Sequence, residues 1–158
     1  MFPFLERVRF LKTGSEGCAA AIRIARTYTG ANFILSEGYH GWHDAFTSMT
    51  PPAHGVPDED GFYMLPLPEK LDDTEGNQIG GIIIEPVITD TSSQRIAKIK
   101  QIRDYCTKHD IPLIFDETIT AFRFPNYSVA QYYNILPDLW VGGKAVGGGI
   151  PISIATGS

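Results

Sequence analysis

Two almost uninterrupted apolar runs constrain the fold more than any other feature of this chain: GGIIIEPV at residues 80–87 and IPLIFDE at residues 111–117. Such β-branched runs are typical of strands that are buried on both faces of a parallel sheet. Between them, residues 94–110 carry apolar side chains at helical spacing. The side chains expected to face the core are Ile96, Ile99, Ile102 and Tyr105 or Cys106. A strand, a helix and a second strand in this order predict a parallel crossover unit.

The rest of the chain continues this alternation. Further strands are expected at residues 8–13, 31–37, 137–143 and 151–157, and further helices at residues 15–30 and 128–136. The first helix is Ala-rich, is expected to end at Gly30, and has apolar positions at Ala20, Ile24 and Tyr28. Residues 47–78 are rich in Pro, Asp and Glu and are expected to run irregularly over the surface. The predicted fold class is α/β, with a mixed, mostly parallel sheet and helices on both faces.

Composition narrows the functional classes. The chain has 158 residues and a formal net charge of −5, without a Lys/Arg cluster, which argues against nucleic-acid binding. Cys18 and Cys106 lack CxxC spacing and are expected to be reduced, buried thiols. No apolar run is long enough for a transmembrane helix, and the N-terminal residues lack a signal-peptide pattern. We therefore expect a soluble, cytoplasmic protein without a membrane or nucleic-acid partner.

Three chemically active side chains follow predicted strands, and ligands gather at the carboxyl ends of strands in open α/β sheets. Asp116 ends PLIFD, Glu85 ends GIIIE, and Lys144 lies within WVGGKAVGGGIP at residues 140–151. Each has a structural alternative. Asp116 can simply cap a loop, Glu85 can anchor one, and Lys144 can be a solvated side chain in a glycine-rich turn.

The sequence KTGSEG, between a predicted strand and a predicted helix, has two compatible interpretations. Thr13 and Glu16 have the spacing of a capping box, which explains the motif structurally. Gly14 and Ser15 also present backbone N–H groups and a hydroxyl at a helix N-terminus, which favours binding of an anion.

The stretch EGYHGWHDAF at residues 37–46 contains His40, His43 and Asp44 at spacings that resemble a metal site. No further ligand at a distance is suggested, and zinc sites need three or four, so no metal is expected. Tyr39 is a better candidate, because an aromatic ring after a strand can stack on a planar heterocycle. The alternative is that Tyr39 belongs to the core.

Together these parts match the needs of pyridoxal 5′-phosphate: an anion site, a stacking aromatic ring, a buried carboxylate and a lysine amine. The lysine would form a Schiff base with the cofactor aldehyde. The carboxylate would keep the ring nitrogen protonated, so that the ring accepts electrons. The glycines around Lys144 would let the backbone turn tightly and approach the cofactor.

The sequence resembles the class III, fold-type I aminotransferases, and within them the glutamate-1-semialdehyde aminomutases. The matching stretches, in order, are VRFLKTGSEGCAAAIRIARTYTG, GYHGWHD, GIIIEPV, PLIFDETITAFR and PDLWVGGKAVGGGIPISIATG. The resemblance implies a homodimeric enzyme with pyridoxal phosphate as cofactor and a small-molecule amino donor or acceptor as substrate. The implied site is Lys144 on the aldehyde, Asp116 on the ring nitrogen, Gly14 and Ser15 on the phosphate, Tyr39 and Thr118 against the two faces of the ring, with His40 and Glu85 also contacting the cofactor.

The chain departs from the family pattern at several positions. Thr118 stands where relatives carry Val or Ile, Ala121 where they carry Gly, and Asp90 where the aminomutases carry Asn. The resemblance extends only to the middle of the large domain. Residues 1–158 are therefore expected to be a partial cofactor-binding domain, without the N-terminal segment, the C-terminal small domain and the threonine that a partner subunit contributes.

Three functions are considered. The first is a pyridoxal-phosphate-dependent aminotransferase or aminomutase that acts through a Lys144 Schiff base on glutamate-1-semialdehyde or a sugar-type substrate. The second is a truncated fragment that binds the cofactor without catalysis. The third, a nucleotide-binding domain with VGGKAVGGG as its phosphate loop, is disfavoured because the run lacks GxxxxGK[ST] and a strand is expected after it. Lys144 reactivity separates the first two from the third.

Overall fold

The two apolar runs form neighbouring parallel strands in the middle of a sheet, β4 (Ile79–Ile84) and β5 (Leu113–Glu117). Every residue of both strands is buried, as expected for strands that are covered on both faces. Helix α3 (Ser93–His109) connects them, and its buried side chains include Ile99, Ile102, Tyr105 and Cys106, as predicted. The crossover unit predicted from the sequence is therefore confirmed.

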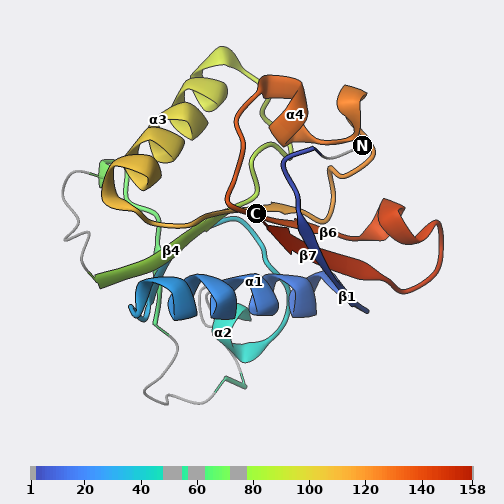
Figure 1. The fold of residues 1–158 in the computed structure, drawn as a ribbon, viewed down its shortest axis with the longest axis horizontal. Helices are drawn as coiled ribbons and strands as arrows, with labels where there is room; N and C mark the ends of the chain where they lie inside the picture. Colours follow the sequence, from blue (N-terminus) through green and yellow to red (C-terminus); the bar gives the residue numbers. More distant parts are fainter. Residues whose placement is uncertain (1–2, 48–54, 57–62, 72–77, 158) are drawn as a thin grey trace.

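The computed structural model describes residues 3–47, 55–56, 63–71 and 78–157, which form one seven-stranded sheet between helices (Figure 1). The other elements are β1 (Arg7–Leu11), α1 (Gly14–Thr29), β2 (Phe33–Glu37), α2 (Asp44–Thr47), β3 (Met64–Pro66), η3 (Pro125–Tyr127), α4 (Val129–Tyr133), β6 (Leu139–Gly142), η4 (Lys144–Gly147) and β7 (Ser153–Gly157). The strand order is β1-β7-β6-β5-β4-β2-β3, and β7 is antiparallel to both of its neighbours. The prediction of a mixed, mostly parallel sheet is confirmed.

Alternating side chains of the central strands supply two separate cores, one on each face of the sheet. In β4, Ile82 and Ile84 pack with α3, whereas Ile83 packs on the other face with α1. Strand β5 repeats the pattern, because Phe115 joins the first core and Ile114 the second. Figure 1 shows the corresponding layers, with α3 and α4 on one side of the sheet and α1 and α2 on the other. Successive side chains of a strand point to opposite faces of the sheet, so the apolar side chains of one strand can pack into the cores on both faces.

Helix α1 confirms its predicted ends but not its predicted apolar face. Gly30 caps the helix in the left-handed conformation, with φ of 70°. Ile24 and Tyr28, however, are 50% and 65% exposed. The buried stripe consists of Ser15, Gly17, Cys18, Ala21, Ile22 and Ala25. Small residues allow a closer approach to the sheet: a Cβ atom on Gly81 of β4 would lie 3.1 Å from the Cβ of Ala25.

Glu117 fixes the end of β5. It is fully buried, and its carboxylate accepts hydrogen bonds from the backbone N–H groups of Val129 (2.7 Å) and Ala130 (3.0 Å) at the start of α4. Burial raises the pKa of this carboxyl, although these hydrogen bonds oppose the effect. The contact holds the backbone immediately after Asp116 against a helix.

Two further predictions need qualification. The strand predicted at residues 8–13 is present as β1, but its side chains are largely exposed although several are apolar, because β1 lies at the sheet edge and pairs only with β7. The stretch 47–78, predicted to be irregular, contains a short strand, β3, that the sequence did not indicate. Within this stretch, residues 48–54, 57–62 and 72–77 lie outside the described residues.

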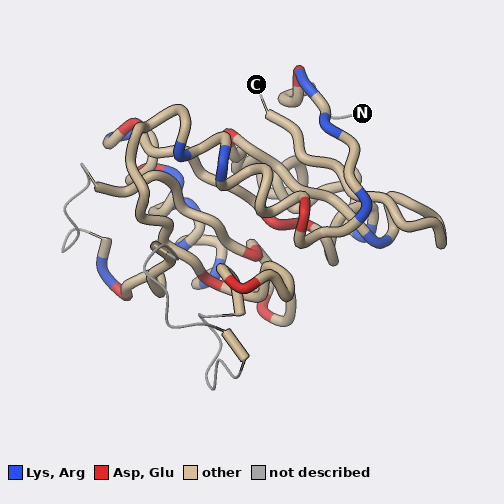
Figure 2. The backbone as a smooth tube through the Cα atoms, turned by 90° about the horizontal axis from the view of Figure 1, so that it is seen from below, with Lys and Arg blue, Asp and Glu red and all other residues tan. Residues whose placement is uncertain are grey.

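The surface of the described residues carries charges of both signs. Figure 2 shows Lys and Arg spread over several elements rather than in one continuous stretch of the backbone drawn there. Among the described helices, none combines the length and the apolar character that crossing a membrane requires.

Candidate active site

All the side chains that the sequence analysis selected for the cofactor line a single cavity of about 120 Å³. Its lining residues are Gly14, Ser15, Tyr39, His40, Gly41, Glu85, Asp116, Thr118, Ile119 and Lys144. A larger cavity of about 500 Å³ lies between α1 and α3, around Tyr28 and Arg103, and contains none of these residues. We therefore place the candidate site in the smaller cavity, where the reactive groups converge.

The sheet topology explains this convergence. Strands β4, β5 and β6 follow one another in the sheet in chain order, whereas β2 lies on the other side of β4, so the order reverses between β4 and β2. Ligands bind where the strand order of an open α/β sheet reverses. Glu85, Asp116 and Lys144 lie at or just beyond the carboxyl ends of β4, β5 and β6, and Tyr39 follows β2.

A buried pair forms the floor of the site. Nδ1 of His40 lies 2.9 Å from Oδ2 of Asp116, and each of the two residues is only 3% exposed. The other carboxylate oxygen of Asp116 accepts the backbone N–H of Thr118 at 3.0 Å. Burial alone would raise the pKa of Asp116, but the hydrogen bonds from His40 and Thr118 outweigh it and leave that pKa lowered. Asp116 is therefore an anion that also orders the following turn, so the loop-capping and the functional interpretations both apply.

The start of α1 forms the proposed anion site. The capping box is present, because the Thr13 hydroxyl accepts the Glu16 N–H at 3.2 Å and the Glu16 carboxylate accepts the Thr13 N–H at 2.9 Å. The Ser15 hydroxyl accepts the N–H of Trp42 at 3.3 Å, which leaves its own proton available for a ligand. The N–H groups of Gly14 and Ser15 belong to the first helical turn, where no helical carbonyl can accept them.

Gly41 keeps this helix start in place. Its φ is 115°, and a Cβ atom there would lie only 2.0 Å from Oγ of Ser15. Only glycine combines this backbone conformation with so close an approach.

Glu85 and Tyr39 are joined at the opposite wall. The Glu85 carboxylate accepts the backbone N–H of Tyr39 at 2.8 Å, so it does anchor a loop while lining the cavity. Burial raises its pKa, and the nearby Asp116 charge adds to the effect. Tyr39 is 60% exposed, which excludes the alternative that it is a core residue. Its ring remains available for a ligand.

Lys144 has an unusual backbone. Its φ is 46°, in the left-handed region that non-glycine residues rarely adopt, and its side chain is exposed at the cavity. The two preceding glycines are needed for close packing: a Cβ atom on Gly142 would lie 2.4 Å from the Trp140 ring, and one on Gly143 would lie 3.0 Å from Cγ2 of Thr118. Strand β7 rather than a long helix follows η4, as expected when the phosphate-loop interpretation was disfavoured.

Thr118 lies between the helix start and the lysine turn. A Cβ atom on Gly14 would approach its Cγ2 to 2.7 Å. Nε2 of His40 is buried without a hydrogen-bond partner among the described residues. Buried polar atoms are normally paired, so this atom suits a site that is completed by a ligand.

The structure regroups the candidate metal ligands. Nδ1 of His40 is turned toward Asp116. The ring of His43 instead stacks on that of Phe46, with 6.4 Å between the ring centroids, and Asp44 is exposed.

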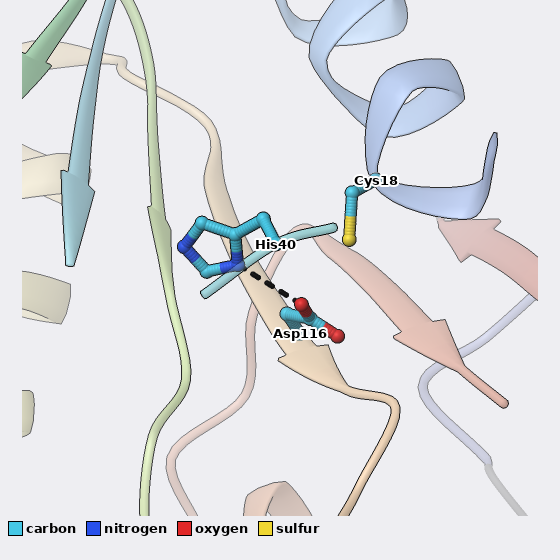
Figure 3. Close-up of side chains that lie close together, drawn as sticks. All are labelled: Cys18, His40 and Asp116. Carbon is cyan, nitrogen blue, oxygen red and sulfur yellow. Dashed lines mark hydrogen bonds and ion pairs between the residues drawn. The ribbon is translucent and has the colours of Figure 1, made fainter. Parts of the chain in front are cut away.

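Cys18 was not predicted as a site residue, yet its thiol lies beside the His40–Asp116 pair (Figure 3). Its position three residues after Ser15 on the same helix could have indicated this. Burial and the nearby Asp116 raise the pKa of the Cys18 thiol.

Arg95 is a second residue that the sequence analysis missed. From the first turn of α3 it donates hydrogen bonds to the carbonyls of Pro86 (2.7 Å) and Glu85 (2.8 Å), and it also pairs with the carboxylate of Glu37. Lys98 pairs with the same carboxylate. Arg95 thus joins the carboxyl ends of β2 and β4, and Lys98 adds a second contact to β2.

These groups fit pyridoxal phosphate. Its phosphate matches the N–H groups and hydroxyl at the start of α1, its ring nitrogen matches the Asp116 carboxylate, and its aldehyde matches the Lys144 amine. Thr118 lines the same cavity as these residues.

Comparison with known proteins agrees with this fit. A family model described as Aminotransferase class-III matches residues 1–158. The glutamate-1-semialdehyde 2,1-aminomutase of Archaeoglobus fulgidus is 37% identical over 99% of this chain and 42% of its own length. The enzyme of the same name from Desulforamulus reducens is also 37% identical, over 95% of this chain and 39% of its own length.

Solved structures show the same fold. An omega-transaminase from Sphaerobacter thermophilus matches with a TM-score of 0.81 and 27% identity, over 99% of this chain and 41% of its own. The FumI protein of Sphingopyxis sp. MTA144, in a pyridoxal-phosphate internal aldimine form, matches with a TM-score of 0.84 and 25% identity, over 98% of this chain and 40% of its own. The chain thus spans about two fifths of the length of the relatives it matches. It belongs to the class-III aminotransferase family, whose cofactor is pyridoxal 5′-phosphate.

Proposed function

We propose that this chain carries the cofactor site of an enzyme that moves an amino group on a small molecule, as an aminotransferase or a 2,1-aminomutase. The observation that carries the proposal is the meeting of Lys144, Asp116 and the start of α1 at one cavity. These residues come from three separate elements and supply an amine, a buried anion and anion-binding N–H groups. Family membership supports the same chemistry.

When bound, pyridoxal phosphate supplies an aldehyde that condenses with amines and a ring that accepts the electrons released from a broken C–H bond. The residues of this chain hold the cofactor in place. The N–H groups of Gly14 and Ser15 would donate to the phosphate, and the Ser15 hydroxyl would donate as well. Tyr39 and Thr118, which line the same cavity, would contact the two faces of the ring.

Asp116 would control the protonation of the ring nitrogen. As a buried anion it would hold a proton on that nitrogen by charge-assisted hydrogen bonding. His40 keeps the carboxylate ionised and oriented through the 2.9 Å contact. Glu85 holds the Tyr39 backbone and therefore the wall of the site.

The Lys144 amine serves as the proton carrier. With the cofactor and a substrate in place, this amine would be positioned to take a proton from one carbon and to return it to another. The left-handed backbone at residue 144 directs the side chain into the cavity. Aminotransferases and aminomutases need the same proton transfers, so the choice between them depends on substrate contacts.

The names of the relatives favour glutamate-1-semialdehyde as the substrate. A sugar-type substrate is the second candidate. We propose that residues 1–158 form part of the large, cofactor-binding domain. We also propose a homodimer, supported by exposed apolar side chains such as Trp42 (74%) and Ile150 (73%) that a second subunit would cover. Two buried free thiols, Cys18 and Cys106, support a reducing, cytoplasmic location.

Borohydride reduction tests the cofactor site. The chain is incubated with pyridoxal phosphate and reduced, and the modified lysine is located by peptide mass. We expect the pyridoxyl label on Lys144, lost in Lys144→Ala and retained in Lys108→Ala, an exposed control at the end of α3. Label spread over surface lysines in the wild-type chain would contradict the proposal.

Turnover separates the enzyme from a fragment that only binds. A separate sample, loaded with pyridoxal phosphate but not reduced, is assayed with glutamate-1-semialdehyde and with amino donors by following the cofactor absorption bands. Conversion that depends on Lys144 supports catalysis by this chain. A specific label on Lys144 without conversion would support the alternative of a cofactor-binding, non-catalytic fragment.

A further inference from the structure

Three potential metal ligands meet on the inner side of the cavity. Sγ of Cys18, a ring nitrogen of His40 and a carboxylate oxygen of Asp116 all lie within 4.8 Å of one another, and all three residues are buried. They come from α1, from the segment after β2 and from β5. Figure 3 shows the thiol pointing toward the pair formed by Nδ1 of His40 and the Asp116 carboxylate.

The donor set has the chemistry of a zinc site. Thiolate, imidazole and carboxylate are the three ligand types that Zn²⁺ takes in proteins, at about 2.0–2.3 Å from the ion. Tetrahedral ligands at such bond lengths lie about 3.3–3.7 Å apart. The widest separation, at most 4.8 Å, therefore needs to close by roughly 1 Å, whereas Nδ1 of His40 and Oδ2 of Asp116, now 2.9 Å apart, need to separate slightly to admit the ion. One thiolate and one carboxylate neutralise the charge of a divalent cation, which makes a buried complex favourable.

The surroundings provide an approach and a fourth ligand. His40 and Asp116 line the cavity of about 120 Å³, which has room for a water molecule on the ion. Asp116 is already oriented by the N–H of Thr118 at 3.0 Å, which is the kind of outer contact that fixes a metal-binding carboxylate. Nε2 of His40 points away from the cluster in Figure 3, so the ring coordinates through Nδ1.

We propose that Cys18, His40 and Asp116 form a site for a soft divalent cation such as Zn²⁺, which the chain binds when the cofactor is absent. Binding forms bonds from the ion to Sγ, Nδ1 and a carboxylate oxygen. The thiol proton leaves to solvent, and the proton on Nδ1 of His40 moves to Nε2. No electron is transferred, and cadmium or cobalt ions of the same charge would occupy the site in the same way.

Cation and cofactor exclude one another at this site. This second step rests on the proposed function, in which Asp116 pairs with the cofactor ring nitrogen. A carboxylate whose negative charge is neutralised by the ion would hold a positively charged ring nitrogen poorly, and one of its oxygens already accepts the N–H of Thr118. The cation is therefore a competitive ligand of the cofactor-free chain.

Cobalt spectroscopy tests the cation site without any activity assay. The chain is stripped of cofactor with phenylhydrazine and titrated with Co²⁺, whose thiolate bond gives a charge-transfer band and whose tetrahedral site gives strong visible bands. We expect both, and we expect Zn²⁺ to displace the Co²⁺ at a ratio of one ion per chain. A spectrum without the thiolate band would overturn the proposal.

Matched cysteine variants identify the thiol. Cys18→Ser is expected to lose the charge-transfer band and to weaken Zn²⁺ binding by about 100-fold, whereas Cys106→Ser should behave as the wild type. Cys106 is a suitable control because it is also a buried, free cysteine, packed on the opposite face of the sheet. Equal Zn²⁺ affinities in the wild type and in Cys18→Ser would refute the assignment of Cys18 as a ligand, provided that circular dichroism shows both cysteine variants to be folded.

A competition measurement tests the exclusion. Pyridoxal phosphate added to the Co²⁺-loaded chain should remove the thiolate band and release one ion, measured with a colorimetric chelator. If the ion stays bound while borohydride labels Lys144, the exclusion is wrong although both sites exist. If Co²⁺ binds through Cys18 but Lys144 is not labelled in the cation-free chain, the proposed cofactor site fails and the cation site stands.

Discussion

Nδ1 of His40 and Oδ2 of Asp116 lie 2.9 Å apart, although 76 positions separate them in the chain. The contact joins the segment after β2 to the end of β5, and neither residue is appreciably exposed. A buried carboxylate is costly unless it is paired, so the histidine stabilises both the fold and the charge that the proposed cofactor needs.

Replacing His40 by alanine is therefore expected to affect stability and cofactor binding together. Removing one partner of a buried pair costs about 3 kcal/mol, and the affinity for pyridoxal phosphate should fall about tenfold or more, which corresponds to about 1.4 kcal/mol. Urea unfolding and a cofactor titration measure the two effects. His43→Ala is the control, because His43 contacts Phe46 rather than Asp116. Equal losses in both variants would show that the pair has no special role.

Gly41 offers a test of the packing behind the anion site. Gly41→Ala should destabilise the chain through the left-handed backbone and through the clash with Ser15, where the added Cβ would come within 2.0 Å of Oγ. Gly149 has a similar φ of 105° but open space around its Cβ position, so Gly149→Ala isolates the backbone strain of about 1–2 kcal/mol. We expect Gly41→Ala to lose at least about 1 kcal/mol more in urea unfolding, because a side chain that does not fit costs about 1–3 kcal/mol. Similar losses in the two variants would mean that Ser15 moves freely aside.

Glu37 should make stability depend on pH in the acid range. Burial raises its pKa, but the hydrogen bonds and charges of Lys98 and Arg95 outweigh burial and leave the pKa below the ordinary value of 4.5. A carboxyl with a lowered pKa in the folded state contributes stability above its unfolded pKa and loses it as the pH falls through the folded pKa. The contribution is therefore complete near neutral pH and disappears as the pH falls below 4.5.

The variant Glu37→Gln tests this dependence. It should be less stable than the wild type at neutral pH by about 1 kcal/mol, since the pair is partly exposed. Below pH 4.5 the free energies of unfolding of the wild type and the variant should converge. Between pH 7 and pH 3, the free energy of unfolding of the variant should therefore fall less steeply than that of the wild type. Glu69→Gln, at an exposed position, controls for the loss of one surface charge. Parallel curves for wild type and Glu37→Gln would contradict the assignment.

The sequence predicts most of the sheet because its central strands are marked by composition. The run Ile79–Ile84 has no polar side chain and Leu113–Glu117 begins with three apolar residues before its two acids, and a parallel crossover allows few arrangements of such strands. Residues at strand ends, such as Asp116 and Glu85, could then be placed at the same edge without knowledge of the strand order. The capping box and Gly30 were predictable for a similar reason, since their signals are local.

What could not be predicted depends on long-range packing. Ile24 and Tyr28 have helical spacing as good as that of Cys18 and Ala25, and only the close approach of the sheet selects the smaller residues. The role of Arg95 depends on where the carbonyl of Glu85 lies after folding. The strained conformation of Lys144 was also not predicted, because the neighbouring glycines suggested that they alone would bend the backbone.

The backbone of Lys144 leads to the last prediction. A non-glycine residue in the left-handed region costs about 1–2 kcal/mol, and strain of this kind persists where a function requires it. Lys144→Gly should therefore be more stable than Lys144→Ala by about 1 kcal/mol, because glycine relieves the strain and alanine retains it. Both variants lack the amine, so neither should take the pyridoxyl label, and the difference in urea midpoints reports the backbone alone. If Lys144→Gly is no more stable than Lys144→Ala, the left-handed turn is not strained. If it is more stable, the chain gives up stability at the residue whose amine the proposed reaction needs.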